Sequence, residues 1–368
     1  MQQEIKNISR RKREMAEFMK NFQGMPDRLL KYCEILLEGE KASPYSFQDT
    51  MSFRKLAIAL TSKCNKRCVW CYRFDPSYKE VLNKELPFAK LKKIVANTKG
   101  KFRMVHLAGL GEPLLYPRLL EAISLARKLS DRVRITTNAT LLTNDLIDKM
   151  IKAGLTDIEL SIHTFEKEAE KKLRGVDLKN SLEKAIYISS QTNLGIQINT
   201  LVSSLNYRGL FSLVEVLKKA KKLTLHAIPF FETKQCRDRG IRRVSDKQYK
   251  VLLDKIGADI EKYHLNWQMS PSPAGSVIDP IIEMKKIKNI CFTCFEDPYI
   301  SEIGELLPCP RTKPFGGVDA TVGFERAWNN AKLLKFRQNM LKGNYPALCG
   351  QLCYLKENNK NKKNEKDA

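Results

Sequence analysis

Three cysteines fall within eight residues of this 368-residue chain, in the segment CNKRCVWC at positions 64–71. The C-x3-C-x2-C spacing puts the thiols of Cys64, Cys68 and Cys71 on one short loop, close enough to bind one metal centre. An iron–sulfur cluster normally takes four thiolates, so a cluster bound by three keeps one iron open for a substrate or cofactor. A zinc site with an open position and a chance grouping of structural cysteines are the alternatives. Zinc usually takes C-x2-C or C-x4-C pairs with histidine elsewhere.

Apolar strand patterns alternate with amphipathic helical patterns from Leu56 onward. The predicted strands are 55–61, 103–108, 132–137, 156–162, 195–202 and 222–230, and helical stretches include 115–130, 143–154, 177–191 and 207–221. Repeated βα units of this length require a parallel sheet covered by helices, which is an α/β fold. Functional groups in such folds gather at the C-terminal ends of the strands, and the three-cysteine segment directly follows the first predicted strand.

The three-cysteine segment resembles the signature of the radical S-adenosylmethionine (SAM) superfamily, C-x3-C-x-aromatic-C, with Trp70 as the aromatic residue and as a candidate SAM contact. The resemblance implies a partial (β/α)6 barrel and a [4Fe-4S] cluster on Cys64, Cys68 and Cys71. The resemblance further implies that the open iron of that cluster would chelate SAM. One electron, from a flavodoxin or ferredoxin-type donor, would then cleave SAM to a 5′-deoxyadenosyl radical that removes a hydrogen atom from the substrate.

Segments that follow the second and third predicted strands resemble SAM-binding motifs of the same family. Gly109-Leu110-Gly111-Glu112-Pro113 is similar to the G-G-E segment, which implies that Gly111 and Glu112 approach the SAM amino group. The segment 136–142, TTNATLL, is similar to T-N-G-x-L-L, which implies that Asn138 contacts the SAM ribose. A glycine turn that ends a strand and an asparagine that caps a helix are the alternatives.

The next two strands supply three more candidate SAM contacts. Ser161 ends the fourth predicted strand and Arg174 follows a short helix, similar to the family pattern S-x-D-G…R-G. The resemblance implies contacts to the SAM carboxylate and ribose, although His163-Thr164 replaces Asp-Gly. An arginine fork suits a carboxylate because it binds both oxygens, whereas a surface arginine at a helix end is the alternative. Asn199 on the fifth strand is a further candidate contact to ribose or substrate.

A second group of cysteines lies near the C-terminus, at Cys291, Cys294, Cys309, Cys349 and Cys353. Residues 291–309 predict two short strands around Gly304 and resemble the C-x(9–15)-G-x4-C opening of the SPASM/twitch extension of radical SAM enzymes. Five cysteines are too few for the two clusters of a complete SPASM domain, so the resemblance implies a single-cluster twitch form. Its auxiliary [4Fe-4S] cluster would have Cys291 or Cys294 as its first ligand. A zinc knuckle is the alternative.

Cys236 is a separate candidate because it follows the sixth predicted strand, on a predicted loop at the face where substrate binds. A thiol there can return a hydrogen atom to a substrate radical, which would make the reaction an epimerisation. An incidental loop cysteine is the alternative.

The sequence also predicts a division into domains and a cellular compartment. We expect a basic helical extension over 1–50, the barrel over 51–235, a helical connection over 236–290, the twitch-like domain over 291–354 and a disordered tail over 355–368. Ten cysteines, a polar start and no apolar run of membrane length predict a cytoplasmic protein with no membrane partner. The net charge of +24 would suit nucleic acid, but the lysines are scattered and we do not favour that partner.

The expected function is oxidation of a small polar metabolite such as a sugar or aminocyclitol, with the auxiliary cluster as electron acceptor. The alternatives are ribosomal-peptide maturation by crosslinking or epimerisation, epimerisation with Cys236 as hydrogen donor, and tRNA modification. A non-catalytic metal-binding nucleic-acid protein would explain the cysteines and lysines but not the ordered motifs at successive strand ends.

Overall fold

A computed structural model describes residues 53, 55–74, 82–164, 166–174, 178–230, 234–269, 293–310, 312 and 316–341. The expected N-terminal extension over 1–50, the expected tail over 355–368 and the candidate ligands Cys291, Cys349 and Cys353 lie outside these residues. Within them, no helix combines the length and the apolar composition that a membrane crossing needs.

The chain forms one ten-stranded sheet with the order β10-β9-β8-β1-β2-β3-β4-β5-β6-β7. The described strands are β1 (Leu56–Ile58), β2 (Val105–Leu107), β3 (Val133–Thr137), β4 (Asp157–Ser161), β5 (Gly195–Val202), β6 (Lys222–Pro229), β7 (Asn266–Met269), β8 (Tyr299–Ile300), β9 (Glu305–Leu307) and β10 (Val318–Asp319). All neighbours from β8 through β1 to β7 pair in parallel, and β9 and β10 add antiparallel strands at one edge.

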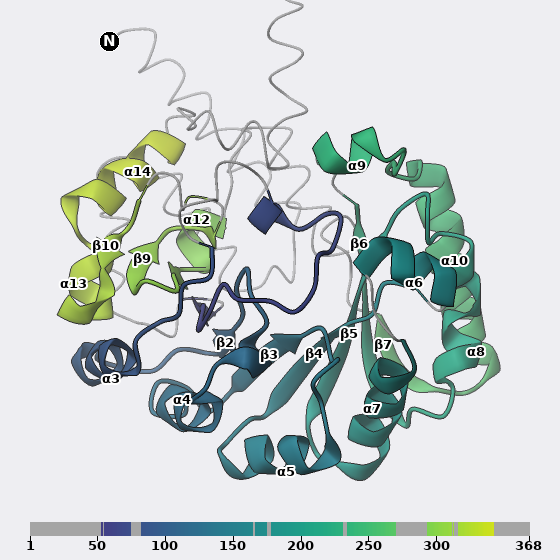
Figure 1. The fold of residues 1–368 in the computed structure, drawn as a ribbon, viewed down its shortest axis with the longest axis horizontal. Helices are drawn as coiled ribbons and strands as arrows, with labels where there is room; N and C mark the ends of the chain where they lie inside the picture. Colours follow the sequence, from purple (N-terminus) through teal and green to yellow (C-terminus); the bar gives the residue numbers. More distant parts are fainter. Residues whose placement is uncertain are drawn as a thin grey trace, which may run out of the picture.

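Helices connect the parallel strands and cover the outer face of the curved sheet (Figure 1). The α-helices are α3 (Phe88–Asn97), α4 (Leu119–Ala126), α5 (Asn144–Lys152), α6 (Lys167–Arg174), α7 (Leu178–Gln191), α8 (Leu213–Leu217), α9 (Lys234–Asp238), α10 (Asp246–Lys262), α12 (Thr293–Glu296), α13 (Phe324–Trp328) and α14 (Ala331–Leu341). The 3-10 helices are η3 (Tyr72–Phe74), η5 (Pro113–Leu115), η6 (Gly209–Ser212) and η8 (Ala320–Val322).

Local sequence explains where several of these helices begin. The Thr143 side chain accepts a hydrogen bond from the backbone of Leu146 at the start of α5. Ser245 and Gln248 form a reciprocal capping box at the start of α10. Because each cap satisfies backbone N–H groups that have no partner within the helix, both starts are fixed by sequence.

The six predicted strands are confirmed as β1 to β6, and the alternation with helices gives the predicted parallel sheet. The two short strands predicted around Gly304 are confirmed as β8 and β9. Gly304 has a φ of 81°, a left-handed conformation that favours glycine in this turn.

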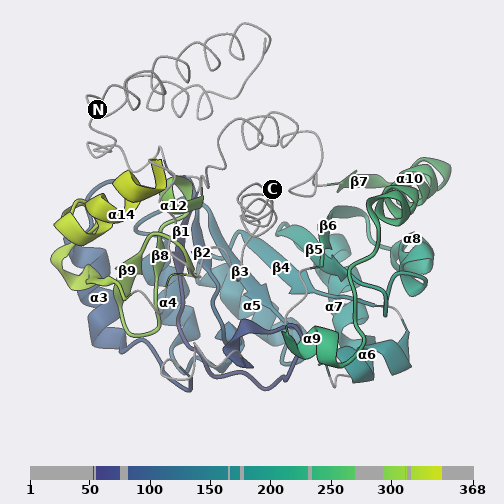
Figure 2. The same ribbon diagram turned by 90° about the horizontal axis from the view of Figure 1, so that it is seen from above.

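Two elements differ from the sequence expectations. Residue 236 was expected on a loop, but it lies in the short helix α9. The segment 236–290 was expected to be helical, and its described part contains the strand β7 as well as α10. β7 pairs in parallel with β6 and extends the sheet beyond the expected six strands (Figure 2).

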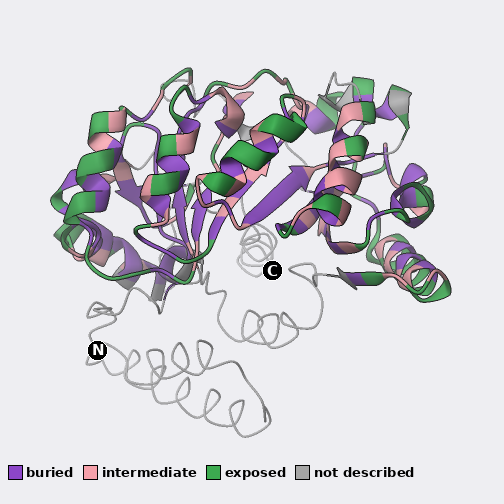
Figure 3. Ribbon diagram, turned by 90° about the horizontal axis from the view of Figure 1, so that it is seen from below, coloured by how far each residue is buried: buried purple, intermediate pink, exposed green. Residues whose placement is uncertain are grey.

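One large apolar core lies between the sheet and its outer helices. Figure 3 shows strands that are mostly buried and helices that bury only the side facing them. The opposite, inner face of the sheet is different, because alternate residues of β3 and β5 are only half-buried there. A period of two places these half-buried residues on one face, which is the concave side of the sheet.

The described C-terminal residues pack against the first strands rather than apart from them. β8 pairs in parallel with β1, and Phe53 contacts Phe102, Phe324 and Trp328 at ring-centroid distances of 5.1–6.1 Å. The Asn97 side chain at the end of α3 donates to the backbone oxygen of Thr321 at 2.7 Å. The C-terminal strands therefore extend the same sheet at the β1 side.

Candidate active site

The loop that carries the three cysteines, here called the cluster loop (residues 59–74), begins directly after β1. Its three cysteine side chains are half-buried. The backbone N–H of Cys71 donates to Cys68 O at 3.0 Å, and Phe74 N–H donates to Cys71 O at 3.2 Å, so the second half of the loop forms tight turns. The Arg73 guanidinium donates to Cys64 O at 3.3 Å and joins the two halves.

The cluster-loop thiols fit the donor set of an iron–sulfur cluster. Burial raises the pKa of the Cys64 and Cys71 thiols, while Arg73 acts in the opposite direction on both. The Cys64 charge also raises the pKa of Cys71. Among the described residues no three Cys, His, Asp or Glu side chains already converge on one point. The fit therefore rests on three thiols on one loop, and a bound metal would bind them as thiolates.

Gly111 and Glu112 lie directly beside the start of the cluster loop. A Cβ at Gly111 would come within 2.4 Å of the carbonyl oxygens of Thr61 and Lys63, so only glycine fits there. The backbone N–H of Glu112 donates to Lys63 O at 2.8 Å. The predicted G-x-G-E segment is therefore in backbone contact with the loop.

The Glu112 carboxylate is buried and joins the ends of β2 and β3. It accepts hydrogen bonds from the Thr137 hydroxyl at 2.6 Å, the Asn138 backbone at 2.8 Å and the Leu114 backbone at 3.2 Å. Its predicted role as acceptor for the SAM amino group stays a prediction. The structure places the Glu112 backbone against the cluster loop.

Asn138 contacts the first half of the cluster loop. Its side-chain N–H donates to Asn65 Oδ1 at 2.9 Å, and Asn65 in turn donates to the Thr140 hydroxyl at 2.9 Å. The Thr140 hydroxyl donates to Asn138 Oδ1 at 2.6 Å and closes a three-residue ring. Ala139, which stands where the family motif has glycine, has a φ of 66°. The predicted ribose contact of Asn138 stays a prediction, and its contact with the loop is an additional role.

Trp70 points away from β1, toward the far strands of the sheet. Its ring packs edge-to-face on His163 at 4.9 Å and contacts Phe230 at 6.3 Å. His163 is buried, and its Nδ1 accepts from the Leu201 backbone at 3.1 Å. The residue that replaces the aspartate of the family pattern thus supports Trp70 and the end of β5.

Ser161 and Asn199 are register partners on β4 and β5 and share the inner face. Asn199 donates to the Glu159 carboxylate at 2.9 Å. Arg174 is the last residue of α6, and its side chain lies outside the described part of the structure. The structure therefore brings Ser161 and Asn199 together and gives only the backbone position of Arg174.

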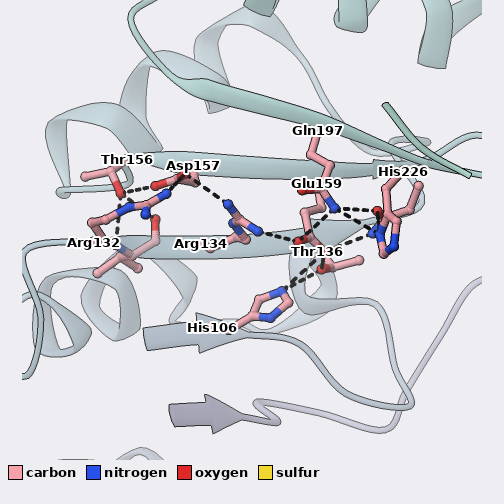
Figure 4. A network of polar contacts seen from close by, with 11 residues as sticks. His106, Arg132, Arg134, Thr136, Thr156, Asp157, Glu159, Gln197 and His226 are labelled. Atoms are coloured by element: carbon pink, nitrogen blue, oxygen red, sulfur yellow. Dashed lines mark hydrogen bonds and ion pairs between the residues drawn. The ribbon is translucent and has the colours of Figure 1, made fainter. Parts of the chain in front are cut away.

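Sequence reasoning missed a polar network on the inner face, centred on Glu159 (Figure 4). Glu159 accepts from Arg134 at 2.7 Å, from the Thr136 hydroxyl at 2.7 Å and from Asn199. His106 Nε2 lies 2.7 Å from the Thr136 hydroxyl oxygen. The signal was present in DIELSI at 157–162, where Asp, Glu and Ser alternate with apolar residues.

The network crosses five neighbouring strands, from β2 to β6. Gln197 donates to Asn199 at 2.7 Å, and His226 Nδ1 lies 3.3 Å from Asn199 Oδ1. Burial raises the pKa of Glu159, but the charges of His106, Arg134 and Lys55 and the Thr136 hydrogen bond outweigh it and lower that pKa to about 2. The inner face therefore holds the Glu159 carboxylate as a buried anion among polar side chains that form hydrogen bonds with one another.

Cys236 is fully buried, and its thiol donates to the Val69 backbone oxygen in the cluster loop at 3.4 Å. It shares an apolar cluster with Val69, Phe230 and Ile241. The structure places the Cys236 thiol against the cluster loop, and its predicted role as a hydrogen donor stays a prediction.

Of the C-terminal cysteines, the structure describes Cys294 and Cys309. Cys294 is buried in α12 just before β8, and half-buried Cys309 comes just after β9. Because β8 and β9 are antiparallel, with Tyr299 opposite Leu307, both cysteines belong to the same end of this pair.

Comparisons with known proteins agree with this arrangement. The family model of the radical SAM superfamily matches residues 58–199. A probable GTP 3′,8-cyclase from Saccharolobus islandicus is 31% identical over 237 residues, which are 61% of this chain and 73% of that protein. A GTP 3′,8-cyclase from Chlorobaculum tepidum is 32% identical over 39% of this chain and 44% of its own length.

Among solved structures, Streptococcus suis SuiB has the same fold. It matches with a TM-score of 0.61 at 16% identity over 89% of this chain and 77% of SuiB. The chain spans about half the length of several curated relatives that it matches. From β1 to β5, the family match covers the cluster loop and the motifs that contact it. The chain belongs to the radical SAM superfamily, which implies a [4Fe-4S] cluster and SAM.

Proposed function

We propose that this protein dehydrogenates a small polar metabolite, such as a sugar or aminocyclitol, in a SAM-dependent radical reaction. When bound, SAM and a [4Fe-4S] cluster at Cys64, Cys68 and Cys71 supply a 5′-deoxyadenosyl radical, and an auxiliary [4Fe-4S] cluster at the C-terminal cysteines accepts an electron. Its four ligands would be Cys309, either Cys294 or Cys291, and Cys349 and Cys353, of which Cys291, Cys349 and Cys353 lie outside the described residues.

The observation that carries the proposal is the convergence of three motifs, which are the cluster loop and the two segments that contact it. Gly111 allows the G-x-G-E segment to contact Lys63, Glu112 brings a negative charge to the same place, and Asn138 contacts Asn65. The motifs come from the ends of β1, β2 and β3, the edge where parallel α/β folds place their active sites. Glu112 would attract the SAM ammonium group, and Ser161 and Arg174 would contact SAM from the next strand and helix.

The auxiliary site is supported by its connection to the barrel. Cys294 and Cys309 flank the β8–β9 pair, and β8 pairs with β1, the strand that leads into the cluster loop. A fully ligated cluster suits electron transfer rather than substrate binding. Loss of a hydrogen atom, a proton and an electron is a two-electron oxidation, so an acceptor in this position favours dehydrogenation. The first electron would come from a flavodoxin or ferredoxin-type partner.

The inner face supports a substrate with hydroxyl or amino groups. Ser161, Gln197, Asn199 and His226 present hydroxyl, amide and imidazole groups that are half-exposed. Arg134 is paired with Asp157 at 3.2 Å and with Glu159 at 2.7 Å. These groups can hydrogen-bond hydroxyl and amino groups of a substrate, and the positive charge of Arg134 is already paired, so the inner face suits a sugar or an aminocyclitol.

Chemistry on a purine nucleotide is the second candidate, favoured by the 31% identity to the Saccharolobus protein named as a probable GTP 3′,8-cyclase. A triphosphate requires several cations, and the inner-face arginine is already paired. Peptide maturation, epimerisation and tRNA modification are less favoured. For peptide maturation, the likeness to SuiB concerns the fold alone. For epimerisation, the candidate hydrogen donor Cys236 is buried. For tRNA modification, the positive charge is scattered along the chain.

The test is substrate-dependent SAM cleavage under anaerobic conditions with a flavodoxin as reductant. The reconstituted protein is incubated with a panel of sugars and aminocyclitols and, separately, with GTP. We expect one of the alcohols to give 5′-deoxyadenosine and an equimolar product that has lost two hydrogen atoms. The control is the triple variant in which Cys64, Cys68 and Cys71 are replaced by Ala. It should give neither 5′-deoxyadenosine nor the dehydrogenated product. Stimulation by GTP alone would contradict the proposal and favour the second candidate.

A further inference from the structure

The cluster loop crosses the open side of the sheet and contacts the element that follows β6. The sheet order places β2, β3, β4 and β5 between β1 and β6. Nevertheless Val69 is packed with Phe230 and Ile241, which follow β6, and Trp70 contacts Phe230. Figures 1 and 2 both show the loop from β1 passing close to α9.

Two polar contacts from α9 reach the loop backbone on either side of Cys71. The Cys236 thiol donates to Val69 O at 3.4 Å, and the Gln235 side-chain N–H donates to Phe74 O at 3.0 Å. Neither acceptor is used by the turns within the loop, which employ Cys68 O and Cys71 O. The α9 contacts therefore add to the internal turns of the loop.

The helix α9 is supported by the chain around it. Ile241 N–H donates to Cys236 O at 2.9 Å, and the Arg242 guanidinium donates to Arg237 O at 2.8 Å. Arg242 and Ser204, which follows β5, exchange two further hydrogen bonds of 2.8 and 3.0 Å. α9 is thus hydrogen-bonded to Arg242, which in turn is hydrogen-bonded to Ser204 after β5.

The first half of the loop has its own support from β3, through the ring of Asn65, Asn138 and Thr140. The α9 contacts provide the matching support for the second half. We propose that Cys236 and Gln235 are positioning residues, which hold the Cys68–Cys71 half of the cluster loop in place before any metal binds.

This role excludes Cys236 from contact with substrate. Its side chain is 0% exposed and its thiol donates to a loop carbonyl, whereas a hydrogen-atom donor must touch the substrate radical. The inference uses the proposal that Cys64, Cys68 and Cys71 bind the cluster, but it does not depend on the substrate or on the oxidation.

Hydrogen–deuterium exchange of the full metal-free chain tests the inference directly. The variants Cys236→Ala and Gln235→Ala should each raise amide exchange in peptides covering residues 66–74 by about fivefold, the factor expected for one lost hydrogen bond. Cys236→Ser keeps a donor of similar size and should exchange like the wild type. Val214→Ala, a buried truncation in α8, is the matched control and should leave these peptides unchanged.

The same variants are then reconstituted with iron and challenged with a chelator. We expect faster iron loss from Cys236→Ala and Gln235→Ala than from Cys236→Ser and Val214→Ala. Wild-type exchange in both alanine variants would overturn the inference. So would a Cys236→Ser variant that has normal exchange and iron content but releases 5′-deoxyadenosine with little product, because that result would make Cys236 a hydrogen donor. The exchange experiment uses neither SAM nor substrate, so it can fail or succeed independently of the proposed function.

Discussion

Replacement of Glu159 by glutamine should destabilise the barrel strongly, because the carboxylate is buried and its charge is required. Its pKa is lowered from 4.5 to about 2, despite burial, by His106, Arg134 and Lys55. At about 1.4 kcal/mol per pKa unit, this shift corresponds to about 3 kcal/mol of stability. Glutamine has one acceptor oxygen where glutamate has two, so it also leaves either Arg134 or the Thr136 and Asn199 pair facing an N–H donor.

The sign of the pH dependence follows from the direction of the shift. A lowered folded-state pKa contributes stability that is complete above the unfolded value and is lost as pH falls from about 4.5 to about 2. The wild type should lose about 3 kcal/mol in this window through Glu159, and Glu159→Gln should lack that part of the dependence.

Urea unfolding of the metal-free chain, followed by circular dichroism at neutral and acidic pH, measures both effects. Glu121→Gln is the control because Glu121 is also ion-paired, with Arg118 at 2.9 Å, but it is exposed on α4. It should give no measurable change. A Glu159→Gln protein as stable as wild type at neutral pH, or with an unchanged acid dependence, would refute the reasoning.

Three further substitutions test the site. Gly111→Ala places a Cβ 2.4 Å from Lys63 O and should displace the cluster loop, so the purified variant should hold less iron than the wild type. Asn138→Ala removes the contact with Asn65 and should speed chelator-driven iron loss by about fivefold, whereas an unchanged rate would restrict Asn138 to a ribose contact. Arg174→Ala should weaken SAM binding by about 1.5–3 kcal/mol with unchanged iron content, measured by equilibrium dialysis, and unaltered affinity would mean that another residue binds the SAM carboxylate.

The strands of the barrel were predictable because each is a short apolar run followed by a helical pattern. β1 to β6 needed only local sequence, and the cluster loop followed from its cysteine spacing. The pairing of β8 with β1 was not predictable in this way, because it joins residues about 240 positions apart and depends on tertiary packing.

The candidate site was likewise predictable where local sequence defines it and not where it depends on tertiary packing. Gly111 and Glu112 were found from a motif, and the structure places them against the loop. Cys236 was assigned to a loop because a five-residue helix has too few residues to show an apolar period. Its burial depends on Val69 and Ile241, which lie far from each other in sequence. The Glu159 network was readable only from the two-residue alternation in β4, and its partners come from other strands.

Iron content measured together with SAM cleavage tests the central claim most directly, that Cys64, Cys68 and Cys71 bind the cluster that cleaves SAM. Anaerobically reconstituted wild-type protein should bind about eight irons, four per cluster, and produce 5′-deoxyadenosine under reducing conditions. The triple alanine variant should keep about four irons and produce none. A triple variant that retains all its iron and still cleaves SAM would contradict the account, and zinc without iron at the C-terminal cysteines would contradict the proposed electron acceptor.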